Sequence, residues 1–272
     1  MPDTATTQPA QAAAGAPRRK RPPPRPVTVE RVERLTPRVI SVTFSGAALE
    51  SFGPPRPGAH MKLLFAPPGF DMPALERGEE GPRPPSRTYT PRRYDPATRR
   101  LDVEFILHGD GLAANWVQKA KPGDALHVAG PGGGYDIPAD ASELILIADD
   151  TAMPAAATIL EALPAGVRAT VVCEVADAKE ERALSSKVKT APEWLHYATQ
   201  GAQPGTLLEK RALELAAAKP DASWWIACEA GAMRRIRKHL LGDRKVAPAK
   251  VHTRGYWKLG ETNYPDHDYG ND

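Results

Sequence analysis

The sequence has few cysteines and no long apolar run. Cys173 and Cys228 are the only cysteines among 272 residues, and each lies in an apolar stretch typical of a reduced core residue. Two cysteines cannot supply the four ligands of an iron–sulfur cluster. No apolar run approaches the roughly 20 residues that cross a bilayer, and the amino terminus lacks the apolar centre of a secretory signal. We therefore expect a cytoplasmic protein that does not insert into a membrane.

The chain also has little excess charge and lacks a glycine fingerprint. Its net charge of +3 is too small to imply nucleic-acid binding, and much of it lies in residues 1–26. That tail is rich in proline, alanine and basic residues, and we expect it to be disordered. No G-x-G-x-x-G sequence follows the first strand expected in the second half. A dinucleotide site there is indicated only by the order of the domains.

The composition is that of an ordinary globular protein, and the length allows two domains. Of all residues, 41% are hydrophobic and 25% are charged. Within residues 27–138, apolar and polar residues alternate in short runs such as 61–65 and 101–107. Such runs, separated by turns and with almost no helix, predict a small closed antiparallel β-barrel. Residues 66–86 are crowded with proline and glycine, and we expect them to form a loop.

The pattern changes in residues 139–250, where apolar strands alternate with helices. Strands are expected at 144–148, 169–175, 193–198 and 224–228. Helices are expected at 152–163, 207–218 and 232–241. This alternation predicts a parallel sheet covered by helices on both faces, followed by a C-terminal segment at 251–272. Such a sheet binds ligands at the carboxyl ends of its strands.

The stretch R-T-Y-T-P-R, from Arg87 to Arg92, is the most informative one in the first half. An R-x-Y-[ST] strand is typical of a flavin-binding barrel. There the arginine meets phosphate, the tyrosine lies against the isoalloxazine ring, and the hydroxyls reach its polar edge. A plain amphipathic strand is the alternative interpretation.

Five short sequences carry a resemblance to a known family. They are R-T-Y-T at 87–90, H-G-D-G-x-A-x-x-W at 108–116, D-T-A-M-P-A at 150–155, E-A-G-A-M-R-R-I-R at 229–237 and G-Y-W-K-x-G at 255–260. In this order, the chain resembles the siderophore-interacting protein family of ferric-siderophore reductases, in the ferredoxin-reductase superfamily. The family commonly has proline and a hydroxyl residue where this chain has Leu112 and Ala114. Backbone N–H groups at the start of that helix still suit a diphosphate, which favours FAD over FMN.

The resemblance implies both an architecture and a reaction. A flavin-binding barrel at 27–138 would precede an NAD(P)H-binding α/β domain at 139–250, with 251–272 returning towards the flavin and the substrate. NADH or NADPH would reduce FAD, and the flavin would pass single electrons to iron(III) in an imported siderophore, releasing iron(II). Because the cofactor carries the chemistry, we expect no catalytic side chain and no bound metal. We expect a monomer, with ferredoxin as a possible alternative donor.

The implied FAD contacts come from both halves of the chain. They are Arg87, Thr88, Tyr89, Thr90, His108, Gly109, Gly111, Ala113, Asp150, Thr151, Tyr256 and Trp257. Some of these residues also have a structural interpretation. His108 could cap a loop, Asp150 and Thr151 could cap the next helix, and Tyr256 and Trp257 could pack between the domains.

The implied nicotinamide contacts are Glu174, Glu229, Ala230 and Arg234. The basic face that includes Arg234 would suit the 2′-phosphate of NADPH, whereas Glu174 would suit the free ribose of NADH. The sequence leaves the choice between the two nucleotides open.

The implied substrate contacts are Lys62, Arg254 and Lys258. Lys62 faces away from the apolar Met61 and Leu63 in its strand. In a concave site, such cations would concentrate an anionic ferric siderophore. An ordinary exposed lysine is the alternative for Lys62.

The sequence leaves two other functions open, and one cluster near its end could suggest a metal site. The first alternative is a reductase that exchanges electrons between nicotinamide and ferredoxin or flavodoxin, and the second is a siderophore-binding flavoprotein without catalysis. Near the C-terminus, Asp266, His267 and Asp268 could suggest a metal site. Adjacent residues of an extended chain point in different directions, so we do not expect one.

Overall fold

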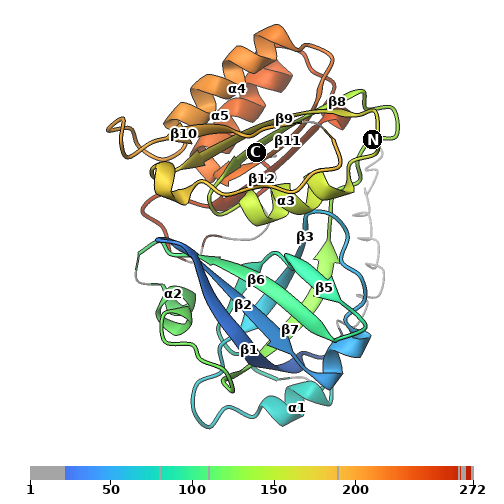
Figure 1. Ribbon diagram of the computed structural model, residues 1–272, viewed down its shortest axis with the longest axis vertical. Coiled ribbons are helices and arrows are strands. Elements are labelled where there is room, and N and C mark those ends of the chain that lie inside the picture. The colour runs from blue at the N-terminus through green and yellow to red at the C-terminus, as the bar shows by residue number, and fades with distance from the viewer. Residues whose placement is uncertain are drawn as a thin grey trace, which may run out of the picture.

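The computed structural model describes residues 22–79, 81–109, 111–188, 190–262, 264 and 268–270. These residues form an antiparallel sheet and a parallel sheet, which lie one below the other in Figure 1. The first strand, β1, begins at Arg25, two residues before the domain start expected at residue 27. Residues 1–21 of the expected disordered tail lie outside the described part of the chain.

The antiparallel sheet has the strand order β4-β3-β7-β1-β2-β6-β5. Its strands are β1 (Arg25–Thr36), β2 (Val39–Ser45), β3 (Ala59–Leu64), β4 (Ser86–Tyr89), β5 (Arg93–Asp95), β6 (Arg100–Ile106) and β7 (Ala125–Gly133). One continuous segment closes the sheet, because β4 pairs with β3 at one end while β5 pairs with β6 at the other. The predicted barrel is confirmed, and R-T-Y-T-P-R is part of the segment that closes it.

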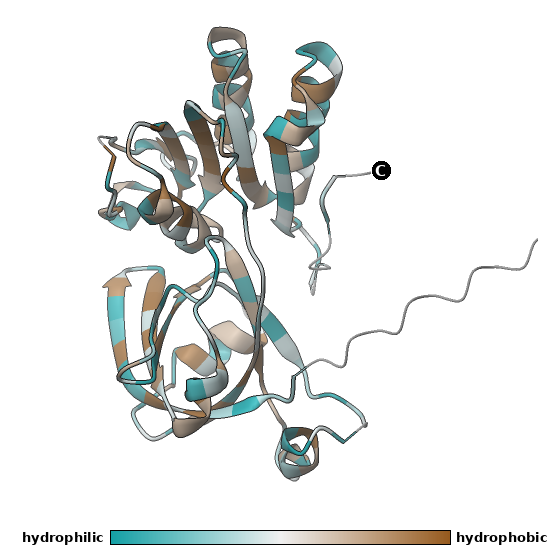
Figure 2. Ribbon diagram, turned by 90° about the vertical axis from the view of Figure 1, so that its right-hand side faces the viewer, coloured by the Kyte–Doolittle hydropathy of each residue, from teal (hydrophilic) through white to brown (hydrophobic). Residues whose placement is uncertain are grey.

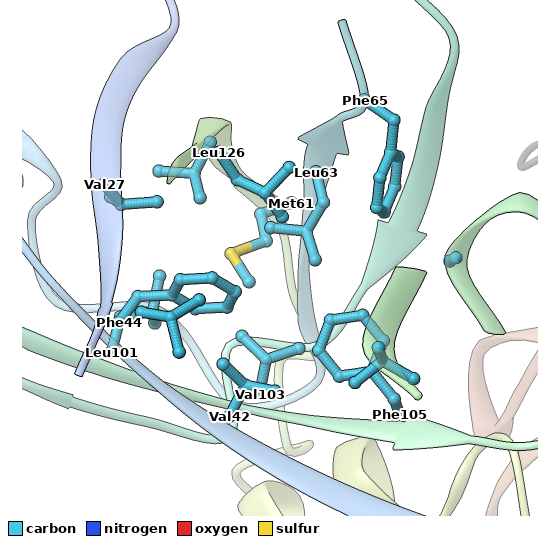
Figure 3. Close-up of a cluster of buried hydrophobic side chains, with 14 of the residues drawn as sticks. Val27, Val42, Phe44, Met61, Leu63, Phe65, Leu101, Val103, Phe105 and Leu126 are labelled. Carbon is cyan, nitrogen blue, oxygen red and sulfur yellow. The ribbon is translucent and has the colours of Figure 1, made fainter. Parts of the chain in front are cut away.

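The interior of the barrel follows from the period of two in its strands. Phe44 of β2, Met61 of β3 and Phe105 of β6 converge in Figure 3, each at most 1% exposed. The intervening residues of each strand point outwards, as alternation requires. Burying each large apolar side chain contributes about 1.5–3 kcal/mol. This core fixes which face of β3 and β4 is turned outwards.

The expected loop at 66–86 is interrupted by a short helix, α1 (Met72–Glu76). The Asp71 side chain accepts a hydrogen bond from the backbone N–H of Ala74 over 3.1 Å and so caps the helix. Met72 and Leu75 pack with Leu64 in a small separate cluster. The expectation of a loop throughout this region was therefore wrong.

The parallel sheet has the strand order β10-β9-β8-β11-β12. Its strands are β8 (Glu143–Asp149), β9 (Arg168–Val175), β10 (Glu193–His196), β11 (Ser223–Glu229) and β12 (Val251–Trp257). The helices on it are α3 (Met153–Ala162), α4 (Thr206–Ala218) and α5 (Ala230–Lys238), which ends in a π-helical turn, His239–Asp243. Figure 2 shows that these strands are mostly hydrophobic, as expected for a sheet covered on both faces.

Alternate residues of β8 contribute to the two cores of this domain. Ile145 and Ile147 pack with α4 and α5, whereas Leu144 and Leu146 pack with α3 on the opposite face. The predicted α/β class is therefore confirmed. The strand β12 was not predicted as part of the sheet, and it extends the parallel sheet to Trp257, beyond the domain end expected at residue 250.

The two domains meet along α3 and β12, the edge strand of the parallel sheet, both of which lie on the side of that sheet nearest the barrel in Figure 1. Thr158 of α3 accepts a hydrogen bond from the Gly58 backbone N–H over 2.9 Å. On β12, the ring of His252 lies 5.2 Å from that of Tyr135. Among the described residues, no helix is both long and apolar enough to cross a bilayer.

Candidate active site

The β4 strand presents two chemically different faces. Tyr89 is paired with Met61 and faces the core, where its ring centroid lies 4.5 Å from that of Phe105. Burial raises the pKa of the Tyr89 hydroxyl, so the group stays protonated. Thr88 is paired with Lys62 and points to the opposite face. Its hydroxyl oxygen is buried and has no hydrogen-bond partner among the residues that the structure describes.

Aromatic contacts connect the helix α2 (Leu112–Val117), which follows β6, to the strand β4. Phe105 of β6 contacts Tyr89 of β4 and Trp116 of α2. Trp116 packs against Phe105 with a ring-centroid distance of 5.8 Å and thereby holds α2 on the barrel. Gly109 has φ +62, a conformation that disfavours residues with a Cβ. The N-cap is Gly111, which has no side chain of its own to cap the helix. Backbone N–H groups therefore remain available at Ala113 and its neighbours.

The carboxyl end of β8 is organised by Asp149, which was not among the predicted site residues. One carboxylate oxygen accepts hydrogen bonds from the Thr151 hydroxyl over 2.6 Å and from the backbone N–H of Thr151 over 3.0 Å. The other accepts a 2.7 Å bond from the indole N–H of Trp257. Asp149 also accepts a hydrogen bond from the backbone N–H of Ala152 over 3.2 Å and so holds the turn that leads into α3. The N-cap of α3 is Ala152, not Asp150 or Thr151 as the sequence suggested.

Asp150 lies beside Asp149 but meets different partners. Burial, and then the charge of Asp149, raise the pKa of Asp150 to about 7, while Arg38 and Arg182 oppose that shift. Arg38 comes from the barrel, and it also donates a 2.7 Å hydrogen bond to the Tyr197 hydroxyl. Asp150 therefore lies at the domain boundary, close to a cation of the barrel.

His108 and Trp257 join the two domains at this point. Their rings stack with a centroid distance of 6.3 Å and an interplanar angle of 23°. The pKa of His108 lies below its ordinary value, mainly because the ring is partly buried. The charge of Asp149 opposes this shift, and the charge of Arg38 adds to it. The side chain of the neighbouring Tyr256 forms a hydrogen bond with that of Thr90 in the flavin-type motif. Both aromatic residues of β12 therefore contact the barrel at the domain boundary.

Strand order places the crevice of the parallel sheet between β8 and β11, where the direction of the crossovers changes. Asp149, Thr151, Glu229 and Ala230 lie at this crevice. The Glu229 carboxylate accepts from the backbone N–H of Ala232 over 2.8 Å and thus caps α5.

Glu174, at the carboxyl end of β9, also serves a helix start. Its carboxylate accepts hydrogen bonds from the backbone N–H groups of Gly205 and, over 3.0 Å, Leu208. These bonds cap α4 and engage both oxygens inside the fold. Arg234, the fourth predicted nicotinamide contact, forms an ion pair with Asp268 over 3.0 Å.

Two predicted substrate contacts lie on strands of different sheets, Lys62 on β3 of the barrel and Arg254 on β12 of the parallel sheet. Lys62 is half-buried on the outer face of β3, and His60 lies two residues earlier on the same face. The His60 ring is 3.3 Å from the guanidinium of Arg254 on β12. Lys258 lies just beyond β12 and pairs with Glu261 over 2.5 Å. Sequence reasoning missed His60, although its alternation with Lys62 was a usable signal.

No group of three histidine, cysteine or acidic side chains is placed to hold a metal ion in the described part of the chain. Residues 266 and 267, where we considered and rejected a metal site, lie outside it. Cys173 and Cys228 are buried and unpaired, as predicted. Burial raises the pKa of the Cys173 thiol to about 12.

The residues around β4 and α2 fit the flavin that the sequence suggested. The Thr88 hydroxyl is buried without a partner, which is the condition expected of a group that a ligand completes. The start of α2 carries no capping side chain, and a Cβ added at Gly109 or Gly111 would meet open space. Such a start suits a diphosphate.

A flavin-type barrel joined to a parallel sheet whose strand order reverses between β8 and β11 defines a two-domain flavin-dependent oxidoreductase of the ferredoxin-reductase type. Sequence comparison agrees with this class. Residues 5–135 match the family model described as "Siderophore-interacting FAD-binding domain", and residues 141–260 match that of "Siderophore-interacting protein". The chain belongs to the siderophore-interacting protein family. The predicted family, fold class and FAD cofactor are thereby confirmed.

Individual relatives cover nearly the whole chain. The NADPH-dependent ferric-chelate reductase of Escherichia coli K12 is 31% identical over 86% of this chain and 92% of its own length. Ferric vibriobactin reductase ViuB of Vibrio cholerae serotype O1 is 27% identical over 90% and 93%. The crystal structure of a siderophore utilization protein from T. fusca is 34% identical, covers 90% of this chain and 96% of its own, and has a TM-score of 0.74.

Proposed function

We propose that this chain reduces the iron(III) of an imported ferric siderophore with electrons from NADH or NADPH, and so releases iron(II). The observation that carries the proposal is the contact of His108 with Trp257 and of Trp257 with Asp149. These contacts bring the flavin-type barrel to the nucleotide-binding edge of the parallel sheet. Bound FAD supplies the chemistry, because it takes a hydride from nicotinamide and gives up single electrons.

The barrel residues would bind and orient FAD. We assign the pyrophosphate to Arg87 and to backbone N–H groups between Gly109 and Ala113, since both are suited to anions. The isoalloxazine ring is assigned to the outer face of β4, and Tyr89 would support that strand from the core side. The hydroxyls of Thr88 and Thr90 are assigned to the polar edge of the ring, where the unpartnered Thr88 oxygen would gain a hydrogen bond. His108, Tyr256 and Trp257 would cover the ring from the domain boundary.

The parallel sheet would hold the nicotinamide nucleotide at its crevice. We assign direct contacts to Asp150, Thr151, Ala230 and Arg234, which lie on or beside the strand ends. Glu174 and Glu229 would not touch the nucleotide but would position the helix starts beside it, because their carboxylates hold the first turns of α4 and α5. Arg234 could meet a 2′-phosphate only by exchanging its ion pair with Asp268.

The substrate would bind at the basic residues on the barrel side of β12. Lys62, Arg254 and Lys258 would attract an anionic chelate. Hard oxygen ligands hold iron(III) better than iron(II), so reduction weakens the complex. We place the reaction in the cytoplasm and assign it to a monomer, with reduced ferredoxin as an alternative donor.

The test is an anaerobic assay of FAD-loaded protein with a panel of ferric siderophores. NADH, NADPH and reduced ferredoxin are supplied separately, and iron(II) is trapped by a ferrous chelator. The proposal predicts trapped iron(II) with a nicotinamide nucleotide or with ferredoxin, at a rate that depends on the siderophore. A protein that takes up no FAD, or whose bound FAD reduces no ferric chelate, contradicts it.

A further inference from the structure

An exposed tyrosine near the C-terminus lies over one of the basic residues of the site. The Arg254 guanidinium carbon is 5.8 Å from the ring centroid of Tyr269, within the range of a cation–π contact. Arg254 is only 9% exposed, whereas Tyr269 is 40% exposed. The ring therefore has one contact with a buried cation while much of its own surface faces solvent.

The backbone on both sides of Tyr269 is held in place. The Thr253 hydroxyl donates a 2.6 Å hydrogen bond to the Tyr269 carbonyl oxygen. The Gly255 backbone N–H donates to the Asp268 carbonyl oxygen over 2.8 Å. On the other side, Arg237 donates to the Gly270 carbonyl oxygen over 3.1 Å. None of these bonds uses the tyrosine ring, so the ring is presented by a segment that does not depend on it.

The side chain of Asp268 also holds this C-terminal segment in place. It accepts two hydrogen bonds from Arg234, over 3.0 and 3.2 Å, and one from the Tyr264 hydroxyl over 2.5 Å. A Cβ at Gly255 would lie 2.6 Å from the Asp268 carboxylate, so the close approach of the segment to β12 requires glycine there. Substitution of Tyr269 should therefore leave the segment attached.

The cation under Tyr269 is also connected to the barrel. Arg254 contacts His60 over 3.3 Å, and Lys62 follows His60 on the same outward face of β3. Tyr269, Arg254 and His60, from three separate segments, are thus in contact at the domain boundary, and Lys62 is the next residue on the outward face of β3. A planar ring carrying anionic oxygens matches this combination. The ring stacks on tyrosine, and the oxygens are attracted by lysine and arginine.

We propose that Tyr269 is a specificity-determining substrate contact that favours ferric chelates with aromatic ligands, of the catecholate class, over anionic chelates without rings. This inference rests on the proposed function for the location of the substrate site. Arg254 and Lys62 attract both kinds of anion. Tyr269 adds contact energy only for a chelate that presents a ring.

The test compares Tyr269→Leu with Tyr269→Phe, which keeps the ring. Binding is measured with redox-inert gallium(III) complexes, so the result does not depend on reduction. Gallium(III) 2,3-dihydroxybenzoate is the aromatic anionic probe, and gallium(III) citrate is the anionic probe without a ring. We expect Tyr269→Leu to weaken binding of the aromatic probe about fivefold. We expect about twofold change or less for citrate, and for either probe in Tyr269→Phe.

Several outcomes overturn the inference. They are equal weakening of both probes by Tyr269→Leu, no weakening of the aromatic probe, and no binding of that probe by the wild-type protein. Parallel reduction assays with iron(III) complexes of the same two ligands separate this inference from the proposed function. If iron is reduced but Tyr269→Leu affects both substrates alike, only the inference fails. If the gallium probes show the expected selectivity but no iron is reduced, only the proposed function fails.

Discussion

Trp257 at the end of β12 donates its indole N–H to Asp149 at the end of β8 over 2.7 Å. The same indole ring stacks on His108 of the barrel. A single side chain thus connects two strands that are separated by β11, and connects both to the flavin-type domain. This contact holds the ends of β8 and β12 in a fixed relation across the end of β11.

Removing the indole N–H should weaken this connection without removing the ring. In Trp257→Phe, the buried Asp149 carboxyl group loses one donor, and we expect the free energy of unfolding to fall by about 2 kcal/mol. Urea denaturation measures the loss. A double-mutant cycle with Asp149→Asn should show that the two effects are coupled. Additive effects would mean that the 2.7 Å contact contributes little.

The buried hydroxyl of Thr88 should act in opposite ways on the free and the FAD-bound protein. Thr88→Val removes a buried oxygen that has no partner among the described residues. The free energy of unfolding of the FAD-free protein should therefore rise by about 1 kcal/mol. The Kd for FAD should rise about fivefold, because a hydrogen bond to the flavin is lost. Thr43→Val is the control, since the Thr43 hydroxyl donates to Asp102 over 2.6 Å. Thr43→Val should lower the free energy of unfolding and leave the Kd for FAD unchanged. A higher Kd for FAD in Thr43→Val but not in Thr88→Val would exclude Thr88 from the flavin site.

Asp150 should make the protein less stable as the pH rises. Its folded-state pKa of about 7 lies above the ordinary value of 3.8, so the folded protein keeps a proton that the unfolded chain releases. The stability from this group is present below about pH 4 and is lost as the pH rises through 7. Asp150→Asn should remove this slope and gain on the order of 2 kcal/mol relative to wild type at pH 8. Chemical denaturation between pH 4 and 8 measures the difference, and parallel curves for the two proteins would contradict the assignment.

A buried chain of charges joins the domains on the side of β6. Glu104 pairs with Arg92 over 3.3 Å and with Arg182 over 2.9 Å, and all three side chains are at most 13% exposed. Glu104→Gln should cost about 3 kcal/mol, because the buried Arg182 loses the carboxylate with which it pairs, whereas Arg92 keeps its ion pair with Glu161 over 2.7 Å. Glu30→Gln breaks an exposed pair with Arg100 and should change the free energy of unfolding far less, because solvent screens that pair. Equal losses of unfolding free energy in the two variants would show that burial of the Glu104 group is unimportant.

Local patterns predicted most of the elements correctly. Alternation in β3 and β6, and apolar runs in β8 and β11, reflect the face or faces that each strand buries, so they could be recognised without the structure. The strand β12 was harder to recognise. Its sequence V-H-T-R-G-Y-W mixes polar and aromatic residues, because one face meets the barrel and the other meets α5.

The site was less accessible because its contacts join distant parts of the chain. His60 and Arg254 are separated by 194 positions, and no local pattern encodes their contact. The carboxylates at the strand ends were correctly located, but their partners were not. Glu174 suggested a ribose contact, although its oxygens meet the backbone of α4, which the sequence places about 30 residues later.

The most direct test of the central claim is a single-turnover experiment. FAD-loaded protein is reduced anaerobically with an equimolar amount of NADPH or NADH and is then mixed with excess ferric siderophore and a ferrous chelator. The account predicts that the absorbance of oxidised flavin returns while a pair of iron(II) ions forms for each FAD, since each reduced flavin holds two electrons. A reduced flavin that stays reduced in the presence of every ferric siderophore tested, with no iron(II) trapped, would contradict it.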